Sequence, residues 1–410
     1  MIRSDDPRYG WVMVFTTFTL TALAFGALAS VSVFLKPLAA DFGWTRSETS
    51  FGYTTVAFSS ALCGIFWGYL ADRVGGRWFG LIGAVSMSAC LFLMSRQASL
   101  VEFYALYFVY GALGMSTVSA PLYASVGFWF KRRPGFALGI TAAGGAIGQG
   151  IVPFFVSLAI SAYGWQTAYV LMAAVYLAIA LPVSFLVREA PDRRSARIAG
   201  ADVPPKEFPL SDKEVMIWIG VAVIFCCNCM AAPIVHLVPL LTDQGHAPSV
   251  AASVLLVLMI AGGFGRVMGG KLCDVIGALP AYMIMALGQS VFVYWFPHLA
   301  GLSSFYLLAV VFGFTYSGVM SSILVSTRIM VSPGFAGRAM AITSFFGWLG
   351  MGMGGFLGGV HYDATGDYVR TYSYASVMGA TNVLILIAFY LRTKRSGLRA
   401  GTSPAEIPVR

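Results

Sequence analysis

The residue with the clearest chemical potential is Arg266, which lies within the apolar stretch 249–270 in the sequence GGFGR. A guanidinium inside a membrane-spanning helix costs about 2.5–3.5 kcal/mol on insertion scales, and such groups usually face a cavity. Its planar fork binds a carboxylate through two parallel hydrogen bonds. We therefore predict that Arg266 binds an anionic substrate. The alternative is that its side chain snorkels to the polar side near Lys271.

Six further side chains are candidates for lining the same pathway. Tyr316 lies between two glycines in the middle of an apolar stretch, and Ser119 and Tyr123 flank a proline in another. Phe345, Phe346 and Trp348 would supply apolar walls. Aromatic residues are common in membrane-spanning helices, so plain packing is the alternative interpretation of each aromatic side chain.

Acidic side chains are missing from the middle of the apolar stretches. The 17 Asp and Glu residues fall in tails, loops or at the ends of those stretches, so we predict no carboxylate proton carrier there. His236 is the remaining titratable candidate, because an imidazole with its usual pKa of about 6.5 suits proton exchange. The alternative is a hydrogen-bonded histidine near the outer end of its helix.

Other constellations that resemble reactive sites have simpler interpretations. Cys226, Cys227 and Cys229 lie inside one apolar stretch without a nearby carboxylate, which favours small packing residues over a metal cluster. We expect free thiols rather than disulfides. The glycine-rich run 139–150 lacks the strand before it and the Lys-Ser/Thr after it that a phosphate loop needs, so we predict close helix packing. We expect no enzyme activity, no cofactor and no metal.

The composition explains where these residues must sit. Of the 410 residues 58% are hydrophobic and only 10% are charged, against about 25% charged in soluble domains. The mean hydropathy is +0.78. A disordered chain, a nucleic-acid module and a coiled coil are excluded. Stretches long enough to span a bilayer are 10–35, 50–71, 78–97, 102–128, 136–160, 167–187, 214–241, 249–270, 280–296, 302–326, 339–360 and 372–391.

These stretches predict an all-α membrane protein with twelve transmembrane helices in two pseudo-symmetric six-helix bundles. The polar segment 188–213 separates them. We expect an N-terminal bundle over 1–187, a cytoplasmic linker over 188–213, a C-terminal bundle over 214–392 and a cytoplasmic tail over 393–410. No cleavable signal is expected, because the first apolar stretch is of full length.

The basic residues set the predicted orientation. Most of the 26 Lys and Arg residues lie on the side of both tails, whereas Lys36, Arg46, Arg96 and Arg370 lie on the other. This asymmetry follows the positive-inside rule, so both termini should be cytoplasmic. The net charge of +9 is thus a topology signal, and no nucleic-acid partner is expected. We expect a multi-pass monomer in a plasma membrane, most simply a bacterial inner membrane.

Two pairs of matching strings reveal an internal repeat. Asp72 and Asp274 each follow a glycine by four residues and precede another by three, and the string PGFA occurs at 134–137 and again at 333–336 with nearly the same separation. The repeat predicts that each aspartate faces the helix start of the other half, where unpaired N–H groups favour an anion. We expect these contacts to close the cytoplasmic side. The predicted gating residues are Asp72, Arg73, Arg77, Asp274 and Arg338.

The string GYLADRVGGR, beginning at Gly68, closely resembles the signature loop of the major facilitator superfamily. A narrower resemblance is to its monocarboxylate and oxalate/formate transporters. It rests on FKRRP from Phe130, on GRVMG around Arg266, on the opening Gly10-Trp11 and on SVFLKP from Ser32. The resemblance implies twelve helices and alternating access. It also implies that the arginine corresponding to Arg266 binds the substrate carboxylate.

Three departures from that branch narrow the prediction. Gly262 stands where animal monocarboxylate transporters carry an acid, Ala29 where they carry a lysine, and residues 339–360 lack the lysine of oxalate exchangers. These differences argue against a two-cation site for a dianion and against the animal-type proton relay. We predict transport of a small organic anion, a monocarboxylate, coupled to protons or to anion exchange. The alternatives are efflux of an amphipathic compound and, in a different class, a transporter-like sensor.

Overall fold

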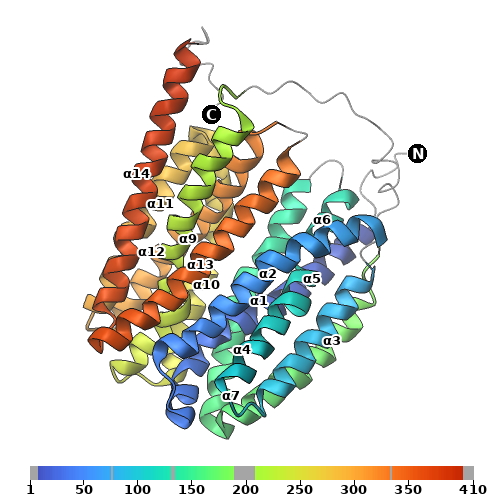
Figure 1. Ribbon diagram of the computed structural model, residues 1–410, viewed down its shortest axis with the longest axis vertical. Coiled ribbons are helices and arrows are strands. Elements are labelled where there is room, and N and C mark those ends of the chain that lie inside the picture. Colours follow the sequence, from blue (N-terminus) through green and yellow to red (C-terminus); the bar gives the residue numbers. More distant parts are fainter. Residues whose placement is uncertain (1–7, 75–76, 131–133, 189–207, 333–334, 400–410) are drawn as a thin grey trace. The chain divides into compact units, whose positions relative to one another are not determined.

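The structure is a computed structural model that describes residues 8–74, 77–130, 134–188, 208–332 and 335–399. Within these ranges the regular elements are all helices, and no strand occurs. The chain divides into two compact units. Unit 1 comprises 1–201 with 241–256, and unit 2 comprises 202–240 with 257–410. Long helices run side by side within each unit (Figure 1).

Unit 1 contains the helices of the first half of the chain. A long first helix is possible because its apolar residues are distributed all around its axis, as expected for a helix buried between others. The helices are α1 (Arg8–Phe42), α2 (Arg46–Val74), α3 (Arg77–Met94), α4 (Leu100–Val109), α5 (Ser116–Val118), α6 (Ala120–Trp129) and α7 (Pro134–Ser184).

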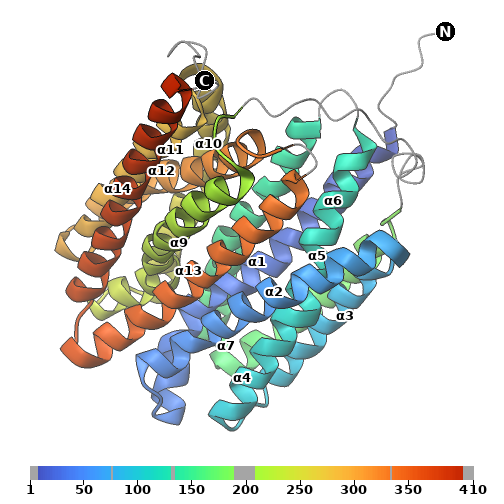
Figure 2. The ribbon, with the colours of Figure 1, turned by 45° about the horizontal axis from the view of Figure 1, so that its top comes forward.

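One helical pass in unit 1 is broken into pieces that follow one another nearly in line (Figure 2). A π-helical turn, Tyr110–Met115, connects α4 to α5. Ser119 then leaves helical geometry, with φ −85° and ψ −86°, before α6 begins. Proline in the first turn of α6 favours a break, because Pro121 lacks the N–H that would bond the Thr117 carbonyl and its ring crowds that carbonyl.

The 51-residue helix α7 covers two of the predicted apolar stretches. Gly164 interrupts it with φ 80° and ψ 167°, a conformation that L side chains rarely adopt, so the helix turns back at this point. Its first part packs tightly on α1. A Cβ on Gly144 or Gly148 would collide with the backbone of Phe18 or Ala22. The prediction that the glycine-rich run serves close helix packing is therefore confirmed.

Unit 2 contains most of the second half. Its helices are α9 (Asp212–Asp243), α10 (Pro248–Ile276), α11 (Ala278–Trp295), η2 (Phe296–His298), α12 (Leu302–Ile329), α13 (Ala336–Thr365) and α14 (Val369–Arg399). The end of α9 and the start of α10 group with unit 1.

Within the described ranges, nine helices are long and apolar enough to cross a membrane, and Trp78–Met94 is a shorter apolar helix. One of the nine, Ala137–Ser184, has 48 residues and contains the turn at Gly164. Counting that helix twice, and adding α2 and α3, accounts for the twelve predicted passes.

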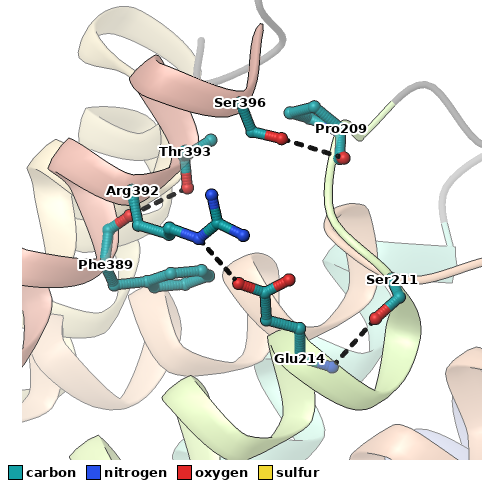
Figure 3. Close-up of polar contacts among 7 residues, drawn as sticks. All are labelled: Pro209, Ser211, Glu214, Phe389, Arg392, Thr393 and Ser396. Atoms are coloured by element: carbon teal, nitrogen blue, oxygen red, sulfur yellow. Dashed lines mark hydrogen bonds and ion pairs between the residues drawn. The ribbon is translucent and has the colours of Figure 1, made fainter. Parts of the chain in front are cut away.

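The start of α9 is fastened to the end of α14 (Figure 3). Arg392 Nε lies 2.9 Å from Glu214 Oε1, and the Ser396 hydroxyl donates to the Pro209 carbonyl at 3.4 Å. Phe208 is buried and its ring lies 6.4 Å from that of Phe389. The last residues of the segment expected to be a polar linker are thus packed against a helix.

Candidate functional site

A line of glycines on α10 brings its backbone against α12. A Cβ on Gly265 would collide with the carbonyl oxygen of Phe314, and one on Gly269 would lie 2.6 Å from Gly318 Cα. Small residues at this spacing let two helices approach at backbone distance. The residue between these two glycines in sequence, Arg266, is therefore held beside α12.

Arg266 is attached to α12 by both its backbone and its side chain. Its carbonyl accepts a hydrogen bond from the Ser321 hydroxyl at 2.9 Å. Its guanidinium interacts with the Tyr316 hydroxyl through a side-chain hydrogen bond and electrostatically. Arg266 Nε is buried, although the residue as a whole is only half-buried. The structure thus joins two of the residues that the sequence analysis proposed for the substrate pathway.

Tyr316 is held in place by packing. It is 3% exposed, and its ring stacks on that of Phe312 with centroids 6.1 Å apart and planes 6° apart. The Tyr316 hydroxyl and the Arg266 guanidinium, held side by side, are two pre-organised hydrogen-bond donors for an anion.

Helices α9 and α13 pack against each other in unit 2. A Cβ on Gly347 would lie 3.6 Å from Cys227 Sγ, and one on Gly220 would lie 2.8 Å from the Phe346 ring. Phe346 is therefore the aromatic residue that packs against α9. The neighbouring Phe345 ring lies 5.7 Å from that of Phe346 and is half-buried. Its role as a wall of the pathway stays a prediction.

The candidates from the first half lie in unit 1. Ser119 forms the break between α5 and α6, and its hydroxyl faces the carbonyl of Ser116 at 3.5 Å. Tyr123 belongs to α6, but its side chain lies outside the described residues. A π-helical turn and a proline break often mark functional positions in helices, which agrees with the choice of this segment as a candidate.

His236 joins α9 to α13. It is fully buried, and its Nε2 lies 2.8 Å from the Gly355 carbonyl oxygen. A Cβ on Gly358 would collide with its ring, and its centroid lies 5.4 Å from that of Tyr368. Nine residues of helix, about 13 Å of rise, separate it from Cys227. This geometry fits a packed, hydrogen-bonded histidine, and its part in proton coupling stays a prediction.

The predicted gating residues are only partly described. The side chains of Asp72, Arg73 and Arg77 lie outside the described residues. Asp274 and Arg338 are exposed, near the end of α10 and the start of α13. Both charges have the sign that the dipole of their own helix end disfavours, and the gate itself stays a prediction.

The sequence analysis did not identify one residue that holds Arg266 in place. Ser321, which fixes the Arg266 backbone, gave no signal because serine is an ordinary packing residue in apolar helices. The glycine spacing on α10 was the available signal for close contact with another helix, but it does not say which helix.

Comparison with known proteins gives consistent results. The Major Facilitator Superfamily matches residues 17–355, with a second match over 217–407. The Uncharacterized MFS-type transporter YcxA of Bacillus subtilis is 24% identical, over 95% of this chain and 97% of its own. Monocarboxylate transporter 13 of Rattus norvegicus is 26% identical, over 94% of this chain and 90% of its own.

The fold also matches a solved structure. A bacterial homolog of the human lysosomal transporter Spinster, crystallised in an inward-facing and occupied conformation, superposes with a TM-score of 0.71. It covers 97% of this chain and 99% of its own, at 17% sequence identity. This likeness bears on the fold alone.

Proposed function

The chain belongs to the major facilitator superfamily, and from this premise we propose that it moves a small organic anion, a monocarboxylate, across a membrane by alternating access. It is a transporter and not an enzyme. The observation that carries the substrate class is the side-chain hydrogen bond between Arg266 and Tyr316 inside unit 2.

The chemistry of that pair favours a monoanion. One guanidinium neutralises one carboxylate, and its fork can bind both oxygens while the tyrosine hydroxyl donates to one of them. The surrounding side chains named above are apolar or small, which suits the short carbon chain of a monocarboxylate better than a second charge. The resemblance to monocarboxylate transporters supports the same substrate class.

The coupling follows from charge balance. Moving an anion alone would transfer charge across the membrane, whereas carrying a proton with it or exchanging it for another anion keeps transport electroneutral. No carboxylate lies in the middle of the apolar stretches of the sequence. We therefore propose proton symport through another group, with His236 as the candidate, or anion exchange. The protein would act as a monomer in a plasma membrane, with both termini in the cytoplasm.

Uptake by proteoliposomes tests the proposal. Purified protein is reconstituted and supplied with isotopically labelled lactate, pyruvate, acetate, oxalate and benzoate, with and without an imposed pH gradient. We expect uptake of at least one monocarboxylate, and competition by unlabelled monocarboxylates but not by the corresponding amides. Competition by amides equal to that by acids would contradict an anion site, and transport of amphipathic cations in place of acids would favour efflux.

A further inference from the structure

The last turns of α14 present a row of cations on the side of the helix that faces away from unit 2. Phe389 and Thr393 are buried, so their side of α14 packs against the other helices of this unit. Successive residues of a helix are rotated by about 100°, which turns the residues between and after them outward. The exposed side chains of these turns are Leu391, Arg392, Lys394 and Arg395.

An apolar stripe leads up to these cations along the same side of α14. Leu384, Ile387 and Leu391 are exposed and lie three or four residues apart, a spacing that places them one above the other on a helix. Exposed apolar side chains of a membrane-spanning helix contact lipid tails. Lys394 and Arg395 extend this stripe by one turn. The cations therefore begin where the lipid-facing apolar surface ends.

Helix α9 runs beside this part of α14 in the opposite direction. Glu214 accepts a hydrogen bond from Arg392 Nε at 2.9 Å (Figure 3), and the Trp218 ring stacks on that of Phe389 with centroids 5.7 Å apart. Ile217, which lies between these two contacts in the sequence, is 66% exposed. Exposed apolar side chains are thus present on both helices next to the Arg392–Glu214 pair.

The positive charge of this surface is incompletely neutralised. Arg392 donates to Glu214 through Nε, and within the described residues its two terminal nitrogens make no hydrogen bond. Lys394 Nζ lies 4.9 Å from the centre of the Tyr390 ring, a cation–π contact that leaves its charge in place. In the part of the chain that the structure describes, neither Lys394 nor Arg395 pairs with a carboxylate. Three cations and one carboxylate leave a surplus of two positive charges.

We propose that the adjoining ends of α9 and α14 bind an anionic phospholipid of the leaflet at this end of unit 2. The lipid phosphate contacts Arg392, Lys394 and Arg395, and the acyl chains lie along the exposed apolar side chains of the two helices. Basic clusters directly beyond a membrane span recognise anionic lipids, and a guanidinium can bind two phosphate oxygens at once. The apolar stripe that continues into the cations favours a lipid over a soluble phosphate.

A lipid bound in this way would stabilise the contact between α9 and α14. Its phosphate reduces the repulsion among the three cations, while Arg392 keeps its bond to Glu214 through Nε. The site does not depend on which solute the protein transports.

Thermal unfolding of the purified full-length protein in detergent tests the site. Phosphatidylglycerol and phosphatidylcholine with identical acyl chains are titrated separately at a fixed detergent concentration. We expect phosphatidylglycerol to raise the unfolding midpoint by several degrees more than phosphatidylcholine, because a ligand that binds the folded state stabilises it. In Lys394→Gln combined with Arg395→Gln, the phosphatidylglycerol concentration for half of the effect should rise about 10–30-fold, since each cation near a membrane surface contributes about fivefold.

The matched control removes two other exposed cations that are predicted to lie on the same side of the membrane. Lys271→Gln combined with Arg328→Gln, near the ends of α10 and α12, lowers the net charge by the same amount. Its response to both lipids should equal that of the wild type. Inorganic phosphate at the same phosphate concentration should leave the midpoint of the wild type where chloride of equal ionic strength leaves it.

Four results would overturn the site. Equal stabilisation of the wild type by the two lipids would show that the headgroup charge is not recognised. An undiminished response of the Lys394 and Arg395 double variant would place the lipid elsewhere, and an equal loss in the control variant would reduce the effect to net charge. Stabilisation by inorganic phosphate as large as that by phosphatidylglycerol would show an anion site to which the apolar stripe contributes nothing.

Discussion

Arg266 of α10 and Tyr316 of α12 are joined by a side-chain hydrogen bond in the interior of unit 2, where glycines allow the two helices to touch. The charged group and the hydroxyl thus act as one unit. The packing of Tyr316 on Phe312 fixes the hydroxyl, and the Ser321 hydroxyl fixes the backbone of Arg266. Removing the Ser321 hydroxyl should therefore lower anion affinity with little effect on folding, whereas truncating the fully buried Phe312 should also destabilise the protein.

Replacing Arg266 tests the substrate cation directly. Arg266→Gln removes the charge, and we expect monocarboxylate uptake to fall about 10–150-fold, the value of hydrogen bonds to a charged group of about 1.5–3 kcal/mol. Arg266→Lys keeps the charge but loses the planar fork, so uptake should remain at least about tenfold reduced. Initial uptake rates in proteoliposomes provide the measurement. Normal uptake by Arg266→Gln would rule out its role as substrate ligand.

Removing the Tyr316 hydroxyl should weaken binding more than turnover. In Tyr316→Phe the ring still stacks on Phe312, while the hydrogen bond to Arg266 is lost. We expect KM for the monocarboxylate to rise about three- to twentyfold with a smaller change in maximal rate. The control is Tyr282→Phe, which removes another buried hydroxyl, bonded to Asn382 at 3.5 Å. If both variants change KM equally, the effect is general and not specific to the anion site.

Two neighbouring glycines on α10 offer a matched test of helix contact. A Cβ on Gly265 would collide with the Phe314 carbonyl, whereas one on Gly263 would meet no atom within 4 Å. Gly265→Ala should therefore destabilise the protein by about 1–3 kcal/mol and displace Arg266 from Tyr316. Gly263→Ala should be neutral or stabilise the helix by about 0.5–1 kcal/mol. Thermal unfolding and uptake of both variants are compared, and equal behaviour would contradict the backbone contact.

The sequence was sufficient to predict the helical architecture but not the local helix breaks or the contacts between helices. Hydropathy located all twelve passes because each is a long apolar stretch. The break at Ser119 was not predicted, although Pro121 two residues later was an available signal for it. The π-helical turn at Tyr110–Met115 was not predicted either, because its two glycines weaken a helix without specifying a π turn. The contact of Phe346 with Gly220 of α9 was likewise not predicted, because periodicity alone does not say which neighbouring helix a side chain meets.

The sequence also did not predict which partners the charged residues contact. Lys36 and Arg46 were placed on the outer side by counting, but nothing in the sequence connects them to Asp243, which is half a chain away. Likewise Arg266 was selected as an intramembrane cation, while its attachment to Tyr316 depends on which helix the glycines of α10 contact. Long-range contacts of this kind follow from helix packing.

Substitution of His236 distinguishes proton symport from anion exchange. His236→Gln places an amide nitrogen where the imidazole Nε2 now lies 2.8 Å from the Gly355 carbonyl, so the link between α9 and α13 can persist without a titratable group. If His236 carries the proton, uptake driven by an inward proton gradient should be lost while exchange of internal for external monocarboxylate continues. If it serves packing alone, both activities should stay within about twofold of the wild type.

The control for this substitution is His298→Gln, which changes a histidine in η2 whose ring lies 4.8 Å from that of Tyr294. It should leave both activities unchanged, since His298 lies outside the α9–α13 contact. Thermal unfolding of His236→Gln is measured in parallel, because a large fall in its midpoint would mean that the glutamine does not replace the ring. Uptake by the wild type that ignores a pH gradient, needs no internal anion and follows an imposed sodium gradient would contradict both coupling modes.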